Sequence, residues 1–204
     1  MSTHTLEEIL HPRSIAVVGA SNNPGVSGYS FTVPFLMYGY QGTIYPVNPK
    51  YSEILGITAY PTTREIPDSV DHVISCVPAA EVLNMLEDCS QKEVKCIHLY
   101  TARFSETGRS ESDKLEQEIL KQARQRGSRL IGPNCMGVHY PRERIFFGAD
   151  LSMESGTAGA AAQSGGVASE FARLAPLREV YYSKAISYGN ALDFNECDYL
   201  DYFS

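Results

Sequence analysis

The sequence predicts a doubly wound α/β domain with a parallel sheet over roughly residues 5–140, followed by the start of a second unit after Pro141. Two observations carry this prediction. Short β-rich runs alternate with segments of helical periodicity, which is the pattern of a parallel sheet with right-handed crossovers. The first such run, 15–18, is apolar at every position, as in a strand buried on both faces.

The elements of the first unit are indicated by apolar runs for strands and by apolar spacings of three and four residues for helices. In chain order we expect a strand at 15–18, a helix at 27–38, a strand at 43–47, a connector with a short strand at 60–68, a strand at 72–77, a helix at 79–89, a strand at 96–100, a helix from Ser112 to about Gln125 and a short strand at 129–131. Pro34 is expected to kink its helix or shift its start. Pro78 suits the first turn of the helix at 79–89. Ser112 is expected to cap the helix that Gly127 stops.

The second unit contains fewer elements. We expect a weak strand at 157–162, a turn at 164–166, a helix through Leu174, a strand at 181–187 and a helix that opens near Asn195. Two βα units are too few to close a sheet of this class. We therefore expect that the sequence is cut inside a domain, or that the missing part lies on another chain.

Composition and charge exclude several classes of protein. The chain has 17 Lys and Arg against 24 Asp and Glu, a net charge of −7, which argues against a nucleic-acid-binding surface. No apolar run reaches the roughly 18–20 residues that a membrane span needs, and the first ten residues lack a signal-peptide pattern. The five cysteines form no C-x-x-C pair, so we expect reduced thiols, no metal site and a cytoplasmic location.

The loop after the first strand reads Gly19-Ala-Ser-Asn-Asn-Pro-Gly25. A glycine-bearing loop between a strand and a helix directs backbone N–H groups and the positive end of the helix toward a phosphate. The loop departs from the dinucleotide pattern G-x-G-x-x-G, because Ser21 and Pro24 occupy the places of the second and third glycines. A tight turn that binds nothing is the alternative.

The end of the second strand narrows the choice of ligand. A nicotinamide-dinucleotide enzyme needs an Asp or Glu there to accept from the ribose hydroxyls. This chain has Val47-Asn48-Pro49-Lys50 instead. A lysine favours a phosphorylated sugar, as in coenzyme A or NADP, although a solvated surface lysine is the alternative interpretation.

With these segments in view, the chain resembles the CoA-binding domain shared by the succinyl-CoA synthetase α subunit and the NDP-forming acyl-CoA synthetases, such as ADP-forming acetate–CoA ligase. The resemblance extends over nearly the whole chain. Its carriers are Pro12-Arg-Ser-Ile-Ala-Val-Val-Gly-Ala-Ser21 with Pro24-Gly25, Tyr45-Pro-Val-Asn-Pro-Lys50, Cys76-Val-Pro-Ala79, Leu130-Ile-Gly-Pro-Asn-Cys-Met-Gly137, Gln163-Ser-Gly165, and Ser183-Lys-Ala-Ile-Ser-Tyr-Gly-Asn190 followed by Asp193.

The resemblance implies a Rossmann-like CoA-binding domain at residues 1–140 and an incomplete, flavodoxin-like succinyl-CoA-ligase-like domain at 141–204. It also implies contacts with each part of the ligand. The coenzyme's phosphates would contact Gly19, Ala20, Ser21 and Gly25, and its charged ribose-phosphate end would contact Lys50 with Asn48 and Pro49. The adenine and pantetheine would lie against Val47, Val77 and Pro78, and the thiol would lie near Asn134 and Cys135. A phosphoryl group on the family's catalytic histidine would contact Gln163, Ser164 and Gly165.

The implied reaction converts acyl-CoA, phosphate and a nucleoside diphosphate into a carboxylate, coenzyme A and a nucleoside triphosphate, through an acyl phosphate and a phosphohistidine. The five histidines do not match that histidine's motif, and no nucleotide-grasp portion is present. We therefore expect no catalytic residue in this chain and no turnover by it alone. A second chain, or a missing C-terminal part, would carry the phosphohistidine and the ATP-grasp domain, and a homo-oligomer is possible.

Two other functions stay open from the sequence: a stand-alone CoA-binding regulatory module without catalysis, and an NADP-binding oxidoreductase domain. Three side chains also have two interpretations each. Arg103 stands where the family tends to carry glycine or a small residue, and it either binds a substrate carboxylate or phosphate or points to solvent. Glu106 is a general base or a solvated loop residue. Cys135 is a core residue or a neighbour of the coenzyme's thiol.

Overall fold

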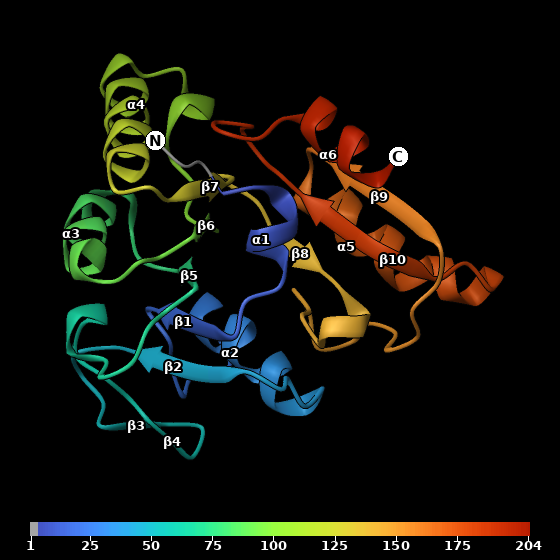
Figure 1. Ribbon diagram of the computed structural model, residues 1–204, viewed down its shortest axis with the longest axis horizontal. Coiled ribbons are helices and arrows are strands. Elements are labelled where there is room, and N and C mark those ends of the chain that lie inside the picture. Colours follow the sequence, from blue (N-terminus) through green and yellow to red (C-terminus); the bar gives the residue numbers. More distant parts are fainter. Residues whose placement is uncertain (1–3) are drawn as a thin grey trace.

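The computed structural model describes residues 4–204 and contains a five-stranded, a three-stranded and a small two-stranded sheet (Figure 1). The five-stranded sheet has the order β2-β1-β5-β6-β7, and every neighbouring pair in it is parallel. Its strands are β1 (Ser14–Val18), β2 (Thr43–Val47), β5 (His72–Ser75), β6 (Cys96–Leu99) and β7 (Arg129–Ile131). The predicted doubly wound parallel sheet is confirmed.

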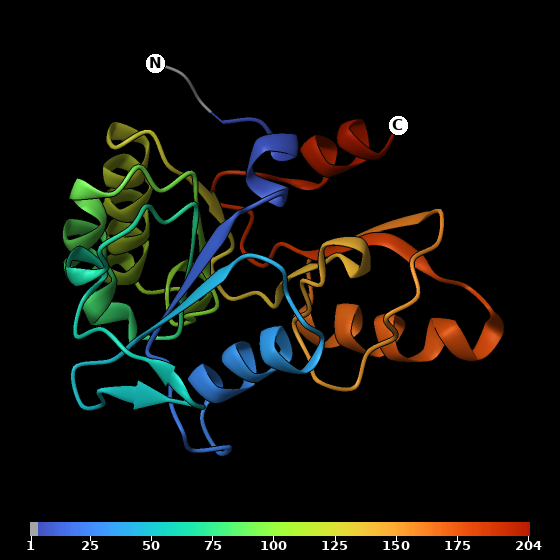
Figure 2. The same ribbon diagram turned by 60° about the horizontal axis from the view of Figure 1, so that its bottom comes forward.

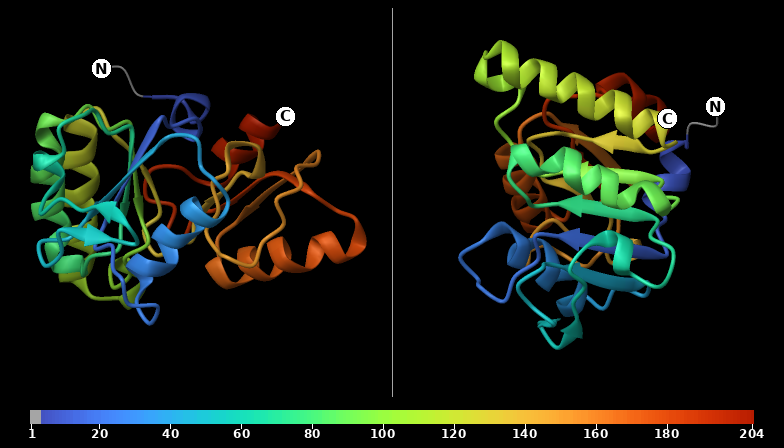
Figure 3. Two further views of the ribbon diagram at one scale, coloured as in Figure 1. Left: turned by 90° about the horizontal axis from the view of Figure 1, so that it is seen from below. Right: turned by 90° about the vertical axis from the view of Figure 1, so that its left-hand side faces the viewer.

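Helices cover both faces of this sheet, as the left view of Figure 3 shows. The helices α3 (Val82–Asp88) and α4 (Ser110–Gln125) lie on one face, and α2 (Ser27–Met37) lies on the other. Alternate residues of β1 point to opposite faces. Ala16 and Val18 therefore join the core beneath α3 and α4, whereas Ile15 and Val17 join the core on the α2 side.

The three-stranded sheet has the order β8-β10-β9. It consists of β8 (Gly137–His139), β9 (Ala158–Ala162) and β10 (Tyr182–Ser187), with β9 parallel and β8 antiparallel to β10. The helices α5 (Gly165–Leu174) and α6 (Glu196–Phe203) pack against it. Ile186, Phe194 and Tyr199 belong to the same apolar cluster as Ile15 and Phe31, so the two sheets share one core. The first strand of the three-stranded sheet, β8, already lies before residue 141. The expected domain division at residue 141 stays a prediction.

A short N-terminal helix, α1 (Leu6–Leu10), was not expected from the sequence. The side chain of Thr5 accepts from the Glu8 N–H, and the Glu8 carboxylate accepts from the Thr5 N–H, which forms a capping box. The helix lies beside α6, as Figures 1 and 2 both show. The Tyr202 hydroxyl of α6 donates to the Glu7 carboxylate at 2.6 Å.

Several expected elements need correction. The helix at 79–89 is a 3₁₀ turn, Ala79–Glu81, followed by α3, which ends at Asp88. Ser112 does not cap α4, because the acidic residues of the first turn extend the helix back to Ser110 and Arg109 takes the N-cap position. The short strand expected at 60–68 is only a bridge between Val47 and Tyr60. The strands β3 (Glu53–Ile54) and β4 (Ile57–Thr58) precede it.

The helix α2 begins at Ser27, as expected, and continues through Pro34 to Met37. Pro34 lies near the end of the helix, so its missing N–H removes only one bond of the last turns. No helix within residues 4–204 is long and apolar enough to cross a membrane.

Candidate functional site

A cleft of about 640 Å³ lies at the carboxyl ends of β1, β2 and β5. Neighbouring parallel strands end at the same edge of a sheet, and this edge is where open α/β sheets bind ligands. Seven of the residues predicted from the sequence line the cleft: Gly19, Val47, Asn48, Pro49, Lys50, Val77 and Pro78.

The loop after β1 has few amide groups left for a ligand. Gly19, with φ of +90°, donates its N–H to the Val47 carbonyl at 2.9 Å. The Asn23 N–H donates to Ser21 Oγ at 3.0 Å, and the Gly25 N–H donates to Asn23 Oδ1 at 2.9 Å. Within residues 4–204, the N–H groups of Ala20 and Ser21 have no acceptor. Ala20, Ser21 and Gly25 are not among the residues that line the cleft, and Ala20 is fully buried.

Asn48 fixes the end of β2 against this loop. Its Nδ2 donates to the Ala20 carbonyl at 2.8 Å, and its Oδ1 accepts from the Lys50 N–H at 3.0 Å. Lys50 is exposed at the cleft, and its ammonium group forms no ion pair with any carboxylate of residues 4–204. The Lys50 ammonium is therefore available to an anionic ligand.

A second wall of the cleft was not predicted from the sequence. This wall comes from the segment after β4 and from the turn and helix that follow β5, and its residues are Pro61, Thr62, Thr63, Glu81, Asn84, Met85 and Asp88. The last four occur at spacings of three, four and seven residues, so they share one helical face. That spacing was the available signal, but the sequence does not say toward which side the face turns.

A second cavity of about 260 Å³ lies between the loop after β6 and the start of α5. Its lining residues are Tyr100, Ala102, Asn134, Cys135, Met136, Gly165 and Gly166. The structure thus brings Asn134 and Cys135 together with Gly165, and their roles near the thiol and the phosphoryl group stay predictions. Ser164 does not line this cavity; it is the N-cap of α5, and its Oγ accepts from the Val167 N–H at 3.3 Å. Gln163 does not line it either, and its carbonyl accepts from the Gly189 N–H.

The surroundings of Cys135, in the second cavity, and of Glu106, in the loop after β6, fit structural roles. Cys135 is 3% exposed, and burial raises the pKa of its thiol, so the group stays neutral. The Glu106 carboxylate accepts from the N–H groups of Arg103 and Phe104 and from Asn190 Nδ2. Burial would raise the pKa of Glu106, but these hydrogen bonds outweigh it and lower the pKa. Glu106 therefore holds the loop in place through these hydrogen bonds, and its lowered pKa does not suit a general base at neutral pH.

The buried histidines are neutral. Burial lowers the pKa of His72 to about 3 and the pKa values of His98 and His139 to about 4. His72 and His98 lie in the core between the five-stranded sheet and α2, where a structural role fits their surroundings. Within residues 4–204, no group of three or more His, Cys, Asp or Glu side chains could hold a metal ion.

Comparison with known proteins identifies the family. Residues 13–141 match the family described as "CoA binding domain". The chain belongs to this CoA-binding domain family. It is 37% identical over 203 residues to the ADP-forming acetate–CoA ligase of Methanocaldococcus jannaschii, covering 98% of this chain and 28% of that protein. It is also 37% identical over 205 residues to the α subunit of ADP-forming acetate–CoA ligase I of Pyrococcus furiosus, covering 98% of this chain and 44% of that one.

A solved structure supports the same assignment. The dinucleotide-forming acetyl-coenzyme A synthetase 1 of Ca. Korarchaeum cryptofilum, in complex with phosphate and ADP, has a TM-score of 0.90 and 33% identity. The match covers 97% of this CoA-binding chain and 42% of that one. The chain thus spans less than half the length of these three relatives. The matches support the synthetase interpretation, and they support neither the stand-alone regulatory module nor the NADP-binding oxidoreductase domain.

Proposed function

We propose that the chain binds coenzyme A or acyl-CoA in the 640 Å³ cleft, as the CoA-binding part of an NDP-forming acyl-CoA synthetase. One observation carries the proposal: the strand-end residues predicted for the coenzyme line one cleft, and the Lys50 ammonium at its edge has no ion-pair partner within residues 4–204. Membership of the CoA-binding domain family and the 37% identity to acetate–CoA ligases support it.

The proposed contacts follow the chemistry of the ligand. The start of α2 suits the phosphates, and the N–H groups of Ala20 and Ser21, which follow the lining residue Gly19 without lining the cleft themselves, would have to become accessible to join it. Lys50 suits the 3′-phosphate of the ribose. Val47, Val77 and Pro78 offer apolar contact to the adenine ring and the pantetheine arm. The thiol end would extend toward Asn134 and Cys135 in the second cavity. Coenzyme A is a product of the proposed reaction and a substrate of its reverse, so it is turned over and is not a permanently bound cofactor.

The proposed reaction is the reversible conversion of acyl-CoA, phosphate and a nucleoside diphosphate into a carboxylate, coenzyme A and a nucleoside triphosphate. The phosphoryl group would meet the amides of Gly165 and Gly166, which open α5. Since Ser164 Oγ already accepts from the Val167 N–H, it leaves these glycine amides as the donors. The phosphohistidine and the ATP-grasp domain would come from a second chain or a further part of the protein. We expect no turnover by residues 1–204 alone.

Calorimetric titration with coenzyme A, dephospho-coenzyme A and NADP tests the proposal. Coenzyme A should bind most tightly of the three, because only it offers both the 3′-phosphate and the pantetheine arm. Binding of NADP in preference to coenzyme A would overturn the proposal. Adding phosphate and a nucleoside diphosphate to the acyl-CoA complex should release no free thiol.

Two further proposals concern the setting of the protein. We propose a cytoplasmic location, which the five unpaired cysteines support. Localisation of a fluorescent fusion would test it.

Self-association also stays a prediction, and light scattering at high protein concentration tests it, because a monodisperse monomer would contradict it.

A further inference from the structure

Arg103 lies in the loop after β6 with a φ of +80°. Glycine adopts this left-handed conformation freely, whereas an arginine there is strained. The resemblance to the synthetases also predicts glycine or a small residue at this place. A long cationic side chain therefore occupies a position whose backbone conformation favours glycine.

The backbone on both sides of Arg103 is firmly held. Thr101 Oγ1 donates to the Val77 carbonyl at 2.7 Å, and the Thr101 carbonyl accepts from the Asn134 N–H at 2.9 Å. The Arg103 and Phe104 N–H groups both donate to the Glu106 carboxylate, and the Phe104 side chain is fully buried. These contacts maintain the strained φ and leave the side chain of Arg103 exposed.

The Arg103 guanidinium has no partner of its own. Within residues 4–204 it forms no ion pair or side-chain hydrogen bond, whereas Arg124 and Arg129 both bind Asp193. Ala102, which lines the second cavity, is one peptide unit of about 3.8 Å from Arg103. The extended arginine side chain is longer than that, so its guanidinium can reach the rim of the cavity.

The cavity then has two separate groups that attract anions. The amides of Gly165 and Gly166 at the start of α5 suit a phosphate, as proposed above. Arg103 itself is not among the lining residues, but its side chain starts next to Ala102, so its guanidinium could approach from the loop after β6, and its planar donor pair matches a carboxylate in a bidentate arrangement. A ligand with its thioester in this cavity and a carboxylate farther along its acyl chain would bring the carboxylate to the guanidinium and leave the glycine amides to the phosphate.

We propose that Arg103 binds the distal carboxylate of the acyl group and so selects CoA thioesters of dicarboxylic acids. This inference rests on the proposed CoA-binding function and names its substrate class. It makes Arg103 a specificity residue for the acyl group, while the coenzyme itself is bound elsewhere, in the larger cleft.

The test is a calorimetric comparison of coenzyme A, butyryl-CoA and succinyl-CoA, because the two thioesters have acyl chains of equal length and differ in the carboxylate. The wild-type protein should bind succinyl-CoA at least about tenfold more tightly than butyryl-CoA. Arg103→Gly should abolish this preference and leave coenzyme A affinity unchanged, and Arg103→Lys should retain part of it. Arg109→Ala removes another exposed arginine without an ion pair in residues 4–204 and should retain the full preference.

The outcomes separate the two proposals. Equal binding of both thioesters by the wild-type protein, or a preference that survives in Arg103→Gly, overturns the role of Arg103 while coenzyme A binding stands. A protein that binds no coenzyme A overturns the proposed function and this inference with it. Circular dichroism and thermal melting check that Arg103→Gly is folded, and its melting temperature should not fall, because glycine relieves the strained φ.

Discussion

At the scale of single residues, the site depends on donors that have no partner among residues 4–204 and on the side chains that position them. Asn48 uses both ends of its amide to join β2 to the first loop, so its role is to position its neighbours. Lys50, two residues later, keeps its ammonium free at the edge of the cleft. The sequence predicted Lys50 because a cation at this strand end replaces the carboxylate of dinucleotide enzymes. It could not predict that the Gly19 N–H donates to the Val47 carbonyl and is therefore unavailable to a ligand.

Lys50→Ala tests the anionic end of the ligand. If Lys50 binds the 3′-phosphate, the variant should lose about 1.5–3 kcal/mol of coenzyme A affinity, the range of a hydrogen bond to a charged group. Its affinity for dephospho-coenzyme A and its unfolding free energy should hardly change. Calorimetry measures the first two and urea unfolding the third. Lys121→Ala, an exposed lysine of α4, is the matched control. Equal wild-type affinities for the two coenzymes would refute the assignment.

At the scale of elements, the strands were predictable because β1, β5 and β6 are buried along their whole length and are therefore rich in apolar residues. The strand β8 was missed because its three residues gain their conformation from distant pairing with β10. The helix α1 has only five residues, too few for a periodicity to be recognised, although its Thr5 and Glu8 form a capping-box pattern. The wall of the cleft formed by α3 depends on how that helix packs, which no local pattern encodes.

The junction between α2 and the first loop depends on Gly28. A Cβ at this position would lie 1.8 Å from the Gly19 carbonyl oxygen and 2.9 Å from Ala20 Cα. These are backbone atoms, so the helix must move away from the loop. Gly28→Ala should therefore cost about 1–3 kcal/mol of unfolding free energy and weaken coenzyme A binding.

Urea unfolding and calorimetry measure both effects of Gly28→Ala. Ser30→Ala, at an exposed position of the same helix, should stay within about 0.5 kcal/mol of the wild type. If the two variants are equally stable and bind coenzyme A alike, the close approach of α2 to the loop does not shape the site.

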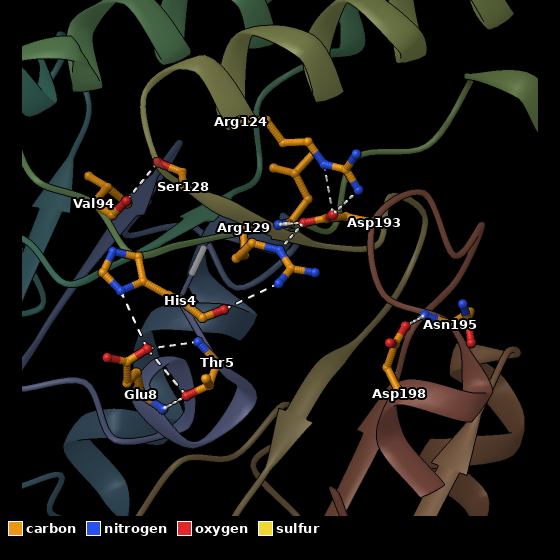
Figure 4. Close-up of polar contacts among 11 residues, drawn as sticks. His4, Thr5, Glu8, Val94, Arg124, Ser128, Arg129, Asp193, Asn195 and Asp198 are labelled. Atoms are coloured by element: carbon orange, nitrogen blue, oxygen red, sulfur yellow. Dashed lines mark hydrogen bonds and ion pairs between the residues drawn. The ribbon is translucent and has the colours of Figure 1, made fainter. Parts of the chain in front are cut away.

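At the scale of the whole molecule, the two sheets are held together by a shared core and by one buried carboxylate, shown in Figure 4. Asp193, just before α6, accepts from Arg124 of α4 at 2.6 Å and from Arg129 of β7 at 2.8 Å. It also accepts from the Leu130 N–H at 2.9 Å. Burial would raise the pKa of Asp193, but these bonds outweigh it and lower the pKa. The sequence marked Asp193 only as part of a family motif, because its partners are more than sixty residues away.

Removing the charge of Asp193 should loosen this connection. Asp193→Asn leaves two arginines without their counter-charge, and a loss of about 3 kcal/mol of unfolding free energy at pH 7 is expected. Chemical denaturation measures it. Asp201→Asn, exposed on α6, should change stability by less than about 0.5 kcal/mol. A loss no greater than that of the control would show that the shared core alone joins the sheets.

The buried histidines make stability depend on pH. Their folded-state pKa values of about 3 for His72 and about 4 for His98 and His139 lie below the model-peptide value of about 6.5. Below pH 6.5 the unfolded chain therefore binds protons that the folded chain does not. Stability should be fully present above pH 6.5 and fall progressively from there toward pH 4.

His72→Leu tests this dependence, because both ring nitrogens of His72 lack a hydrogen-bond partner within residues 4–204. The variant should lose less stability than the wild type between pH 8 and pH 4.5, as measured by urea unfolding at each pH. Parallel losses in the two proteins would assign the acid sensitivity to other groups. Asp71 and Asp193, whose pKa values are lowered from about 3.8, contribute mainly below pH 4.

The pairing of α1 with α6 has a consequence for synthesis on the ribosome. Glu7 and its partner Tyr202 are 195 residues apart in sequence. At typical elongation rates, α1 must wait about 10 to 40 s after it emerges before α6 is made. The apolar side of α1, formed by Leu6, Ile9 and Leu10, is accessible to chaperones during that interval. The contacts that α1 makes with α6 can therefore form only after α6 has been translated.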